Sequence, residues 1–368
     1  MGTRPEAIKL APVVLAALES PEVDPLVLST GQHQEIFQDI LDLYGFQADL
    51  RADVMRHGQS LSQLSARCLR EFEPLLAEAD PDLVIVQGDT TSAAMGALSA
   101  FYHGIPTWHV EAGLRTSTPR SPFPEEMNRR IVGRLADVHL APTLGARENL
   151  LAEGIADSDI IRTGNTGIDA LLLAVAMRDR FDDPALSAIA EGDQPLIVAT
   201  THRRENWDGG IRRVAGALRD LLDRFPDLRA VHAAHPNPNV RSQVEAELAG
   251  HPRVMIPGPV GYGDFARLLS RATIIISDSG GIQEEAPSLG IPVLVAREET
   301  ERVEGLEAGL SLLVGTDREL IVREASRLLT DESARAAMRT GENPYGDGRA
   351  AGRIVSAIAA RAAAIGAS

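Results

Sequence analysis

The strongest constraint on the fold is a repeated alternation of short β-branched runs with helical stretches. Each run ends in a small or polar loop, and each loop opens a helical stretch. Such an alternation predicts parallel sheets with helices on both faces. In the first half the runs lie at 26–28, 83–86, 107–110 and 138–140, and in the second half at 196–199, 230–232, 254–256, 274–276 and 293–295.

Two such series in one chain predict two doubly wound α/β domains, which suits a length of 368 residues. We place the boundary near Gly167, with a first domain at 1–167 and a second at 168–349. An Ala-rich helical stretch follows from 350 to about 365. In doubly wound folds ligands bind beyond the carboxyl ends of the strands, so we expect the active site in the cleft between the domains.

The chain opens with Met1-Gly2-Thr3-Arg4-Pro5-Glu6, a segment typical of the loop between a strand and a helix. The strand that should precede this loop would be central in the sheet, and its loss would expose the apolar flanks of two neighbours. We expect the true start to lie upstream of Met1. The alternative is that the first sheet is incomplete.

Bulk properties exclude several classes of protein. The formal net charge of −16 argues against a nucleic-acid partner, which requires a basic face. The longest apolar runs, such as 274–276, are far too short to span a membrane, and no secretory signal is present. Cys68 is the single cysteine, so we expect a cytoplasmic protein without intrachain disulfides. The histidines lack zincin spacing, and no Walker or Gly-Xaa-Gly-Xaa-Xaa-Gly loop occurs, which disfavours metal, NTPase and dehydrogenase chemistry.

The segment 277–285, Ser-Asp-Ser-Gly-Gly-Ile-Gln-Glu-Glu, follows an Ile-rich run and opens a helix. Glycines let a phosphate approach the backbone, and a helix start offers free N–H groups. Glu285, one turn into that helix, could accept both hydroxyls of a ribose. The alternative is a tight turn with Glu285 as a solvated helix residue.

The corresponding place in the first domain is held by Arg4. Pro5 suits the first turn of a helix, so Arg4 is expected to point into the cleft, where it could pair with phosphate oxygens. An exposed arginine beside a helix start is the alternative.

Three acidic residues, Asp89, Glu111 and Glu125, fall at strand ends or in the loops after them. Carboxylates gathered at this edge of a sheet are candidates for general acid–base catalysis. The alternative is helix capping for Asp89 and Glu125, and a surface charge for Glu126. His202 ends the first strand of the second domain and could donate to a phosphate or protonate a leaving oxygen, unless it only caps its loop.

Together these segments resemble the bacterial non-hydrolysing UDP-N-acetylglucosamine 2-epimerases over nearly the whole chain. The resemblance rests on segments that stand in the same order. They are Gly-Thr-Arg-Pro-Glu-Ala at 2–7, Gly-Asp-Thr-Thr at 88–91, His-Val-Glu-Ala-Gly-Leu-Arg at 109–115, Pro-Glu-Glu-Met-Asn-Arg at 124–129, Thr-Gly-Asn-Thr at 163–166, His-Arg-Arg-Glu at 202–205, Asp-Ser-Gly-Gly-Ile-Gln-Glu-Glu at 278–285 and Asn-Pro-Tyr-Gly-Asp-Gly at 343–348.

The resemblance implies the GT-B architecture, with two Rossmann-like domains and UDP held mainly by the second. It also implies that the C-terminal helix, 350–368, joins the first domain, and that the protein is a homodimer. The residues that match the family's catalytic positions are Asp89, Glu111, Glu125 and His202. Those that match its UDP and substrate contacts are Arg4, Lys9, Phe265, Ser279, Gly280, Gly281, Glu285, Thr300, Glu301 and Arg302.

Two further positions depart from the family pattern. Val303 stands where the family usually has proline after a Glu-Arg pair. Some members also carry a regulatory site for UDP-N-acetylglucosamine, to which Gln32, Gln59 and His235 correspond. Gly58 replaces the arginine that those members place beside the glutamine, so regulation by substrate stays open.

The resemblance implies reversible inversion at C2 of UDP-N-acetylglucosamine to give UDP-N-acetylmannosamine, with UDP eliminated and added back and with no metal or redox cofactor. The expected ligands are the nucleotide sugar and UDP. The alternatives are a hydrolysing epimerase that releases N-acetylmannosamine and UDP, a GT-B glycosyltransferase, and a non-catalytic nucleotide-sugar sensor.

Overall fold

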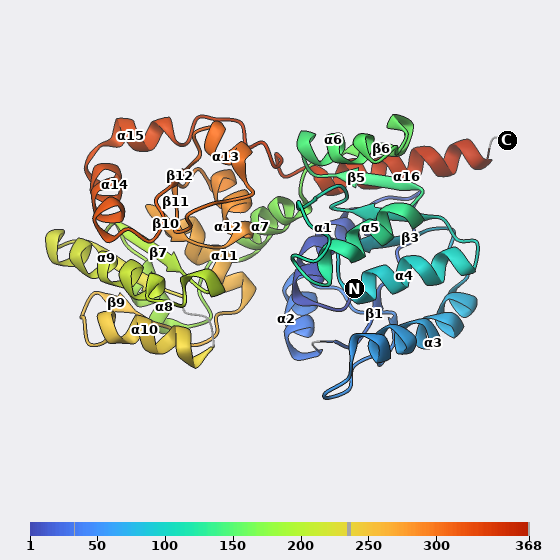
Figure 1. Cartoon of the computed structure of the whole chain (residues 1–368), viewed down its shortest axis with the longest axis horizontal. Coiled ribbons are helices and arrows are strands. Elements are labelled where there is room, and N and C mark those ends of the chain that lie inside the picture. The colour runs from blue at the N-terminus through green and yellow to red at the C-terminus, as the bar shows by residue number, and fades with distance from the viewer. Residues whose placement is uncertain (33, 234–236, 367–368) are drawn as a thin grey trace. The chain divides into compact units, whose positions relative to one another are not determined.

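The computed structural model describes residues 1–32, 34–233 and 237–366. These residues form two compact units, unit 1 at 1–170 with 346–368 and unit 2 at 171–345. Each unit contains parallel strands connected by helices, shown in chain order from blue to red in Figure 1. The predicted class, α/β with two doubly wound parallel-sheet domains, is confirmed.

The strands of unit 1 form two separate parallel sheets. The strands are β1 (Leu28–Ser29), β2 (Leu50–Arg51), β3 (Val84–Gln87), β4 (Thr107–Val110), β5 (Val138–Ala141) and β6 (Ile160–Arg162). One sheet has the order β3-β4-β5-β6, and the other pairs β1 with β2. Among the described residues no strand joins β1 to β3, and the backbone of Met1 bonds to Leu28 and Thr30 beside β1.

The helices of unit 1 are α1 (Arg4–Leu18), α2 (Gln34–Tyr44), α3 (Leu61–Ala79), α4 (Thr91–Tyr102), α5 (Glu125–Leu135), α6 (Leu144–Ala152) and α16 (Ala350–Gly366), with a short turn η1 (Asp157–Asp159). The last helix, α16, returns to unit 1 and packs against α1. Ile354 and Val355 join Leu10 and Trp108 in one buried cluster. The division between the units at Ala170 falls inside α7 (Thr166–Met177).

Unit 2 contains one six-stranded parallel sheet in the order β12-β11-β10-β7-β8-β9. Its strands are β7 (Leu196–Thr200), β8 (Arg229–His232), β9 (Val254–Met255), β10 (Ile274–Ser277), β11 (Val293–Val295) and β12 (Ser311–Leu313). Its helices are α8 (Pro184–Ala190), α9 (Gly210–Arg224), α10 (Pro238–Leu248), α11 (Tyr262–Arg271), α12 (Gly280–Glu285), α13 (Val303–Glu307), α14 (Arg318–Thr330) and α15 (Glu332–Ala337), with the turns η2 (Arg204–Asn206) and η3 (Ala286–Leu289).

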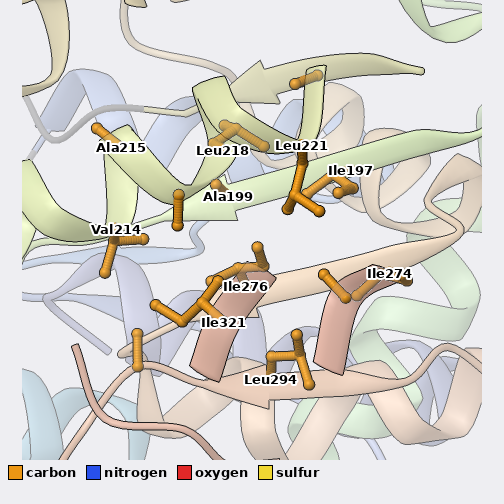
Figure 2. Packing of buried hydrophobic residues seen from close by; sticks show 14 of the residues in the cluster. Ile197, Ala199, Val214, Ala215, Leu218, Leu221, Ile274, Ile276, Leu294 and Ile321 are labelled. Carbon is orange, nitrogen blue, oxygen red and sulfur yellow. The ribbon is translucent and has the colours of Figure 1, made fainter. Parts of the chain in front are cut away.

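The core of unit 2 explains its β-branched runs. Ile197 and Ala199 of β7 alternate with Val198, so one set of side chains faces α9 while the other faces the opposite helix layer. Figure 2 shows this first set packed with Ile274 and Ile276 of β10 against Leu218 and Leu221 of α9. All of these side chains are fully buried. This buried sheet supports the loops at its carboxyl edge, which include the predicted segments at 202–205 and 278–285.

Candidate active site

The predicted acidic residues of unit 1 lie at the carboxyl edge of the larger sheet. Glu111 follows β4 directly, and Asp89 lies two residues beyond the end of β3. These two strands are neighbours, with Gln87 paired to Val110, so the two loops start side by side. Glu125 is the first residue of α5 and is half-buried. The structure thus brings Asp89 and Glu111 to the same edge, as the strand pattern predicts.

Glu111 is fixed by two side chains that come from other elements. Lys9 Nζ of α1 lies 2.6 and 2.7 Å from its two carboxylate oxygens, and the Gln87 amide donates to the same carboxylate. The backbone of Glu111 has φ 65°, a left-handed conformation that is rare for a residue with a Cβ. Residues held in such conformations cluster at functional sites, because the surrounding structure must enforce them. Lys9 is predicted to contact the substrate, and in the structure its ammonium group pairs with the predicted catalytic carboxylate of Glu111.

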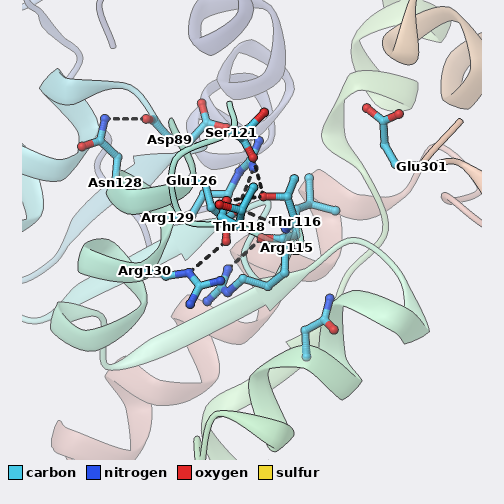
Figure 3. Close-up of polar contacts among 12 residues, drawn as sticks. Asp89, Arg115, Thr116, Thr118, Ser121, Glu126, Asn128, Arg129, Arg130 and Glu301 are labelled. Carbon is cyan, nitrogen blue, oxygen red and sulfur yellow. Dashed lines mark hydrogen bonds and ion pairs between the residues drawn. The ribbon is translucent and has the colours of Figure 1, made fainter. Parts of the chain in front are cut away.

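Asp89 is paired with an arginine that sequence reasoning did not single out. Its carboxylate lies 2.6 Å from a guanidinium nitrogen of Arg129 in α5, and its main-chain carbonyl accepts a 2.9 Å hydrogen bond from Asn128 (Figure 3). Burial raises the pKa of Asp89, the positive charge of Arg129 opposes that rise, and the nearby Glu111 carboxylate adds to it. A carboxyl group with a raised pKa near a second carboxylate is suited to proton transfer.

Glu126 is fully buried, so the interpretation of this residue as a surface charge is wrong. The reason is local: Glu126, Arg129 and Arg130 stand at i, i+3 and i+4, so their side chains meet on one face of α5. Asp89 and Glu125 do not act as side-chain caps either. Thr90 caps α4, and the N-cap residue of α5 is Pro124, which supplies no side-chain cap.

The start of α1 is tied to the same edge of the sheet. Thr3 and Glu6 form a capping box, and Glu6 also accepts a 2.6 Å hydrogen bond from Thr90, the residue after Asp89. Arg4 is the first residue of this helix, and Pro5 lies in its first turn, as the sequence predicts for the proline. The Thr-Xaa-Xaa-Glu spacing of Thr3 and Glu6 is the sequence signal for this buried carboxylate.

In unit 2 the buried carboxylate of Asp278 organises the predicted His202 loop. It accepts hydrogen bonds from the backbone N–H groups of His202 and Arg203 at 3.0 Å and from the Asn206 amide at 2.9 Å, and its other oxygen lies 3.2 Å from His202 Nδ1. Asp278 is completely buried. It joins the end of β10 to the loop after β7 and orients the imidazole of His202. Asp278 lies in a segment that the sequence identified, but its own role needed the structure.

Replacing Asp278 by Asn is expected to lower the free energy of unfolding by about 1–3 kcal/mol. The amide keeps one acceptor oxygen, but its NH2 group replaces the oxygen that faces His202 Nδ1 and N–H, and the negative charge that these donors share is lost. Urea denaturation measures this loss. The matched control is Asp208→Asn, an exposed position a few residues from His202. Equal stabilities for the two variants would contradict the role assigned to Asp278.

The glycine loop follows Asp278 and opens α12. Ser279 is the N-terminal cap residue of α12, and its N–H donates to Ser277 Oγ at 3.0 Å. A Cβ on Gly280 would lie 3.0 Å from the guanidinium carbon of Arg302, so the end of the Arg302 side chain packs directly against this glycine. Gly281 packs close to the Glu285 carboxylate at the other end of this short helix. The structure therefore brings Ser279, Gly280, Gly281, Glu285 and Arg302 together.

The loop 300–302 is held against α12 by side-chain contacts. Thr300 donates to Gln283 at 2.7 Å, and Arg302 pairs with both Glu284 at 2.8 Å and Glu301 at 2.7 Å. Val303, the departure from the family's proline, is the first residue of α13. Proline is favoured at that helical position, so valine keeps the same backbone role with less restriction. Phe265 lies in the first turn of α11 and is half-buried.

The predicted regulatory residues are placed in part. Gln32 accepts a 2.8 Å hydrogen bond from Ser92 in α4, and Gln59 donates to the Val54 carbonyl at 3.1 Å. His235 lies outside the described residues. These contacts fix two amides in unit 1 and leave the regulatory role a prediction.

Within residues 1–32, 34–233 and 237–366, no helix is long and apolar enough to cross a membrane. Within the same ranges, no group of three or more His, Cys, Asp or Glu side chains is arranged to hold a metal ion.

The sequence and the structure of this chain are similar to those of known proteins. The family model described as UDP-N-acetylglucosamine 2-epimerase matches residues 16–359. The UDP-N-acetylglucosamine 2-epimerase of Escherichia coli (strain K12) is 46% identical over 365 residues, 97% of this chain and 96% of that protein. The Yersinia pestis protein of the same name is 44% identical with the same coverage. The crystal structure of UDP-GlcNAc 2-epimerase from Neisseria meningitidis bound to UDP-GlcNAc superposes with a TM-score of 0.85 at 39% identity, covering 97% of both chains.

Proposed function

Because the chain belongs to the UDP-N-acetylglucosamine 2-epimerase family, we propose that it interconverts UDP-N-acetylglucosamine and UDP-N-acetylmannosamine without releasing the free sugar. The observation that carries the proposal is the pair of carboxylates Asp89 and Glu111 at one sheet edge, the second fixed by Lys9. The motifs at 109–115 and 343–348 favour this branch over a hydrolysing epimerase.

The proposed reaction begins at C1 because the C2 proton is not adjacent to a carbonyl carbon. The C1–oxygen bond breaks, and its electron pair leaves with UDP. A carboxylate then takes the C2 proton, and the C2–H electron pair forms the C1–C2 double bond of a 2-acetamidoglucal. A second group delivers a proton to C2 from the opposite face, and UDP adds back to C1. The C2 configuration is inverted, and no oxidant is consumed.

In this proposal the groups of unit 1 move the proton. Glu111 is held as a carboxylate partner of Lys9, and Asp89 has a raised pKa, so the two can exchange a proton with the sugar in different directions. Glu125, half-buried at the start of α5, is the third candidate. Their assignment to the two faces of the sugar is left to experiment.

The groups of unit 2 would hold UDP throughout. N–H groups at Ser279, Gly280 and Gly281 and the imidazole of His202 would stabilise the negative charge that grows on the diphosphate. Arg4 of unit 1 would add a cation. Glu285 would accept from the ribose, Phe265 would lie beside the uracil, and Thr300, Glu301 and Arg302 would line the sugar and diphosphate. Support comes from the packing of Gly280 against Arg302 and from the Asp278 contacts that fix His202.

We also propose that the protein is a cytoplasmic homodimer and that it needs no metal or redox cofactor. Light scattering coupled to gel filtration measures the mass. A monomer of 39.4 kDa at assay concentration would remove the dimer from the proposal.

Incubation with UDP-N-acetylglucosamine in deuterated water tests the reaction. We expect deuterium at C2 of the product, seen as loss of the C2 proton signal by NMR, because the proton removed exchanges with solvent before its replacement. A mixture without protein is the control. Product without label would contradict elimination and re-addition, and accumulating free UDP with N-acetylmannosamine would identify the hydrolysing reaction instead.

A further inference from the structure

Glu126 is the one buried carboxylate of the Pro-Glu-Glu-Met-Asn-Arg segment to which the reaction above assigns no task. Its side chain is 0% exposed. It accepts from the Thr116 backbone N–H at 3.2 Å, from Arg129 at 3.0 Å and from Arg130 at 2.9 Å (Figure 3). A buried carboxylate with this many donors is costly to place and is retained where its charge is needed.

Arg129 has two carboxylate partners at once. One of its terminal nitrogens lies 2.6 Å from Asp89, and the other lies 3.0 Å from Glu126. Only 15% of the Arg129 side chain is exposed, so water screens these contacts weakly. The positive charge of Arg129 is therefore shared between Asp89, a proposed catalytic carboxylate, and the buried carboxylate of Glu126.

The main chain repeats this connection. Asn128, next to Arg129 in α5, donates to the carbonyl of Asp89 at 2.9 Å. The backbone N–H of Thr116 donates to Glu126, and the Thr116 hydroxyl donates to the Ser121 carbonyl, in the loop before α5, at 2.6 Å. Glu126 thus holds both the loop that leads to Glu125 and the arginine that meets Asp89.

We propose that Glu126 is a positioning residue, which shares the charge of Arg129 with Asp89 and so keeps the Asp89 carboxylate only partly compensated and fixed in place. This inference rests on the proposed function. The chemical reason is that a fully compensated carboxylate is a weak base, whereas a carboxylate that competes for its cation takes up a proton more readily.

The charges that face Asp89 come from three elements besides its own. Arg129 of α5 and Lys9 of α1 lower its pKa, and Glu111 at the end of β4 raises it together with burial. Removing the Glu126 charge would leave Arg129 to Asp89 alone. The pKa of Asp89 should then fall, whereas removal of Arg129 should raise it.

The test is the pH profile of kcat/KM for the wild-type protein, Glu126→Gln and Arg129→Gln with UDP-N-acetylglucosamine as substrate. One limb of this profile should report the titration of Asp89. We expect Arg129→Gln to move that limb to higher pH and Glu126→Gln to move it to lower pH by about one unit. The two displacements have opposite signs whether Asp89 acts as acid or base. A Glu126→Gln profile that coincides with wild type, or that moves in the same direction as Arg129→Gln, overturns the proposal.

Arg130→Gln keeps the test open if Glu126→Gln does not fold, because 39% of the Arg130 side chain is exposed. Without Arg130, Glu126 has Arg129 as its remaining cation, and Arg129 should then interact less strongly with Asp89. The limb that reports Asp89 should therefore move to higher pH by a few tenths of a unit. Glu153→Gln is the matched control. Glu153 pairs with Arg115 at 2.7 Å and has no place in the proposed chemistry, so its profile should coincide with wild type.

Failure of this inference is distinguishable from failure of the proposed function. If the wild-type protein incorporates no deuterium at C2, the proposed reaction is wrong. If the wild-type protein turns over and the limbs of the folded Glu126 and Arg130 variants stay in place, only the role of Glu126 is wrong.

Discussion

Glu111→Gln is expected to lower kcat by about 10²- to 10⁴-fold while UDP still binds. The amide has nearly the shape of the carboxylate but cannot take a proton from C2. The substitution also removes the negative charge that lies 2.6 Å from Lys9 Nζ, and with it the ion pair between these two residues. Both effects act on proton transfer within unit 1.

Binding of UDP should survive because the groups proposed to hold it lie mostly in unit 2, which folds around its own core. Isothermal titration with UDP and the NMR turnover assay separate the two properties. Glu148→Gln, the same exchange at an exposed position of α6, is the control. Turnover close to wild type in Glu111→Gln would remove this residue from the mechanism.

The second large effect expected is a loss of stability on acidification from pH 7 to pH 5. His109 and His232 are buried in the strands β4 and β8, and burial lowers the pKa of each to about 4. His109 Nε2 lies 2.8 Å from the Gly88 carbonyl, so that nitrogen carries the single proton of a neutral ring. Its Nδ1 is buried with no partner among the described residues, which leaves an added proton unsatisfied.

The sign follows from the two states. The unfolded chain binds a proton at each of these histidines below a pKa of about 6.5, whereas the folded protein does so only near pH 4. Stability is therefore fully present above pH 6.5 and falls as the pH is lowered toward 4. At pH 5 each histidine costs about 2 kcal/mol, so the pair costs about 4 kcal/mol. Asp89 and Asp169 have raised pKa values and oppose part of this loss.

Urea denaturation at pH 7 and pH 5 measures the difference. His232→Asn and His109→Asn should each remove about 2 kcal/mol of the pH dependence, because each removes one buried titrating ring. Burial also lowers the pKa of His139, so that residue contributes to the remaining pH dependence. His57→Asn, at an exposed position, should leave it unchanged. An identical loss of stability in wild type and in both buried-site variants would contradict this explanation.

The sequence predicted the class of fold because the β-branched runs are long enough to mark buried parallel strands. It missed β2, β6 and β12, which are as short as the predicted β9 and β11 but each include a polar residue, Arg51, Arg162 or Ser311, in place of an unbroken apolar run. The run at 26–28 overlaps β1 by one residue, since strand ends depend on which backbone groups find partners.

The candidate site was predicted at the positions where a residue ends a strand or opens a helix. The partners that hold these residues could not be predicted, because they come from distant parts of the chain. Lys9 and Glu111 are separated by 102 residues, and His202 and Asp278 by 76. Arg129 and Glu126 were accessible through their helical spacing, but their burial depends on how α5 packs.

The return of α16 to unit 1 has a consequence for synthesis on the ribosome. Most of unit 1 emerges before unit 2, yet Ile354 and Val355, which complete the buried cluster of unit 1, are made only after all of unit 2. Unit 2 is contiguous and can fold as soon as it has emerged, whereas Leu10, Val13 and Trp108 are covered only once α16 has followed it. Unit 1 therefore completes its core after unit 2 has been made, although most of unit 1 is translated earlier.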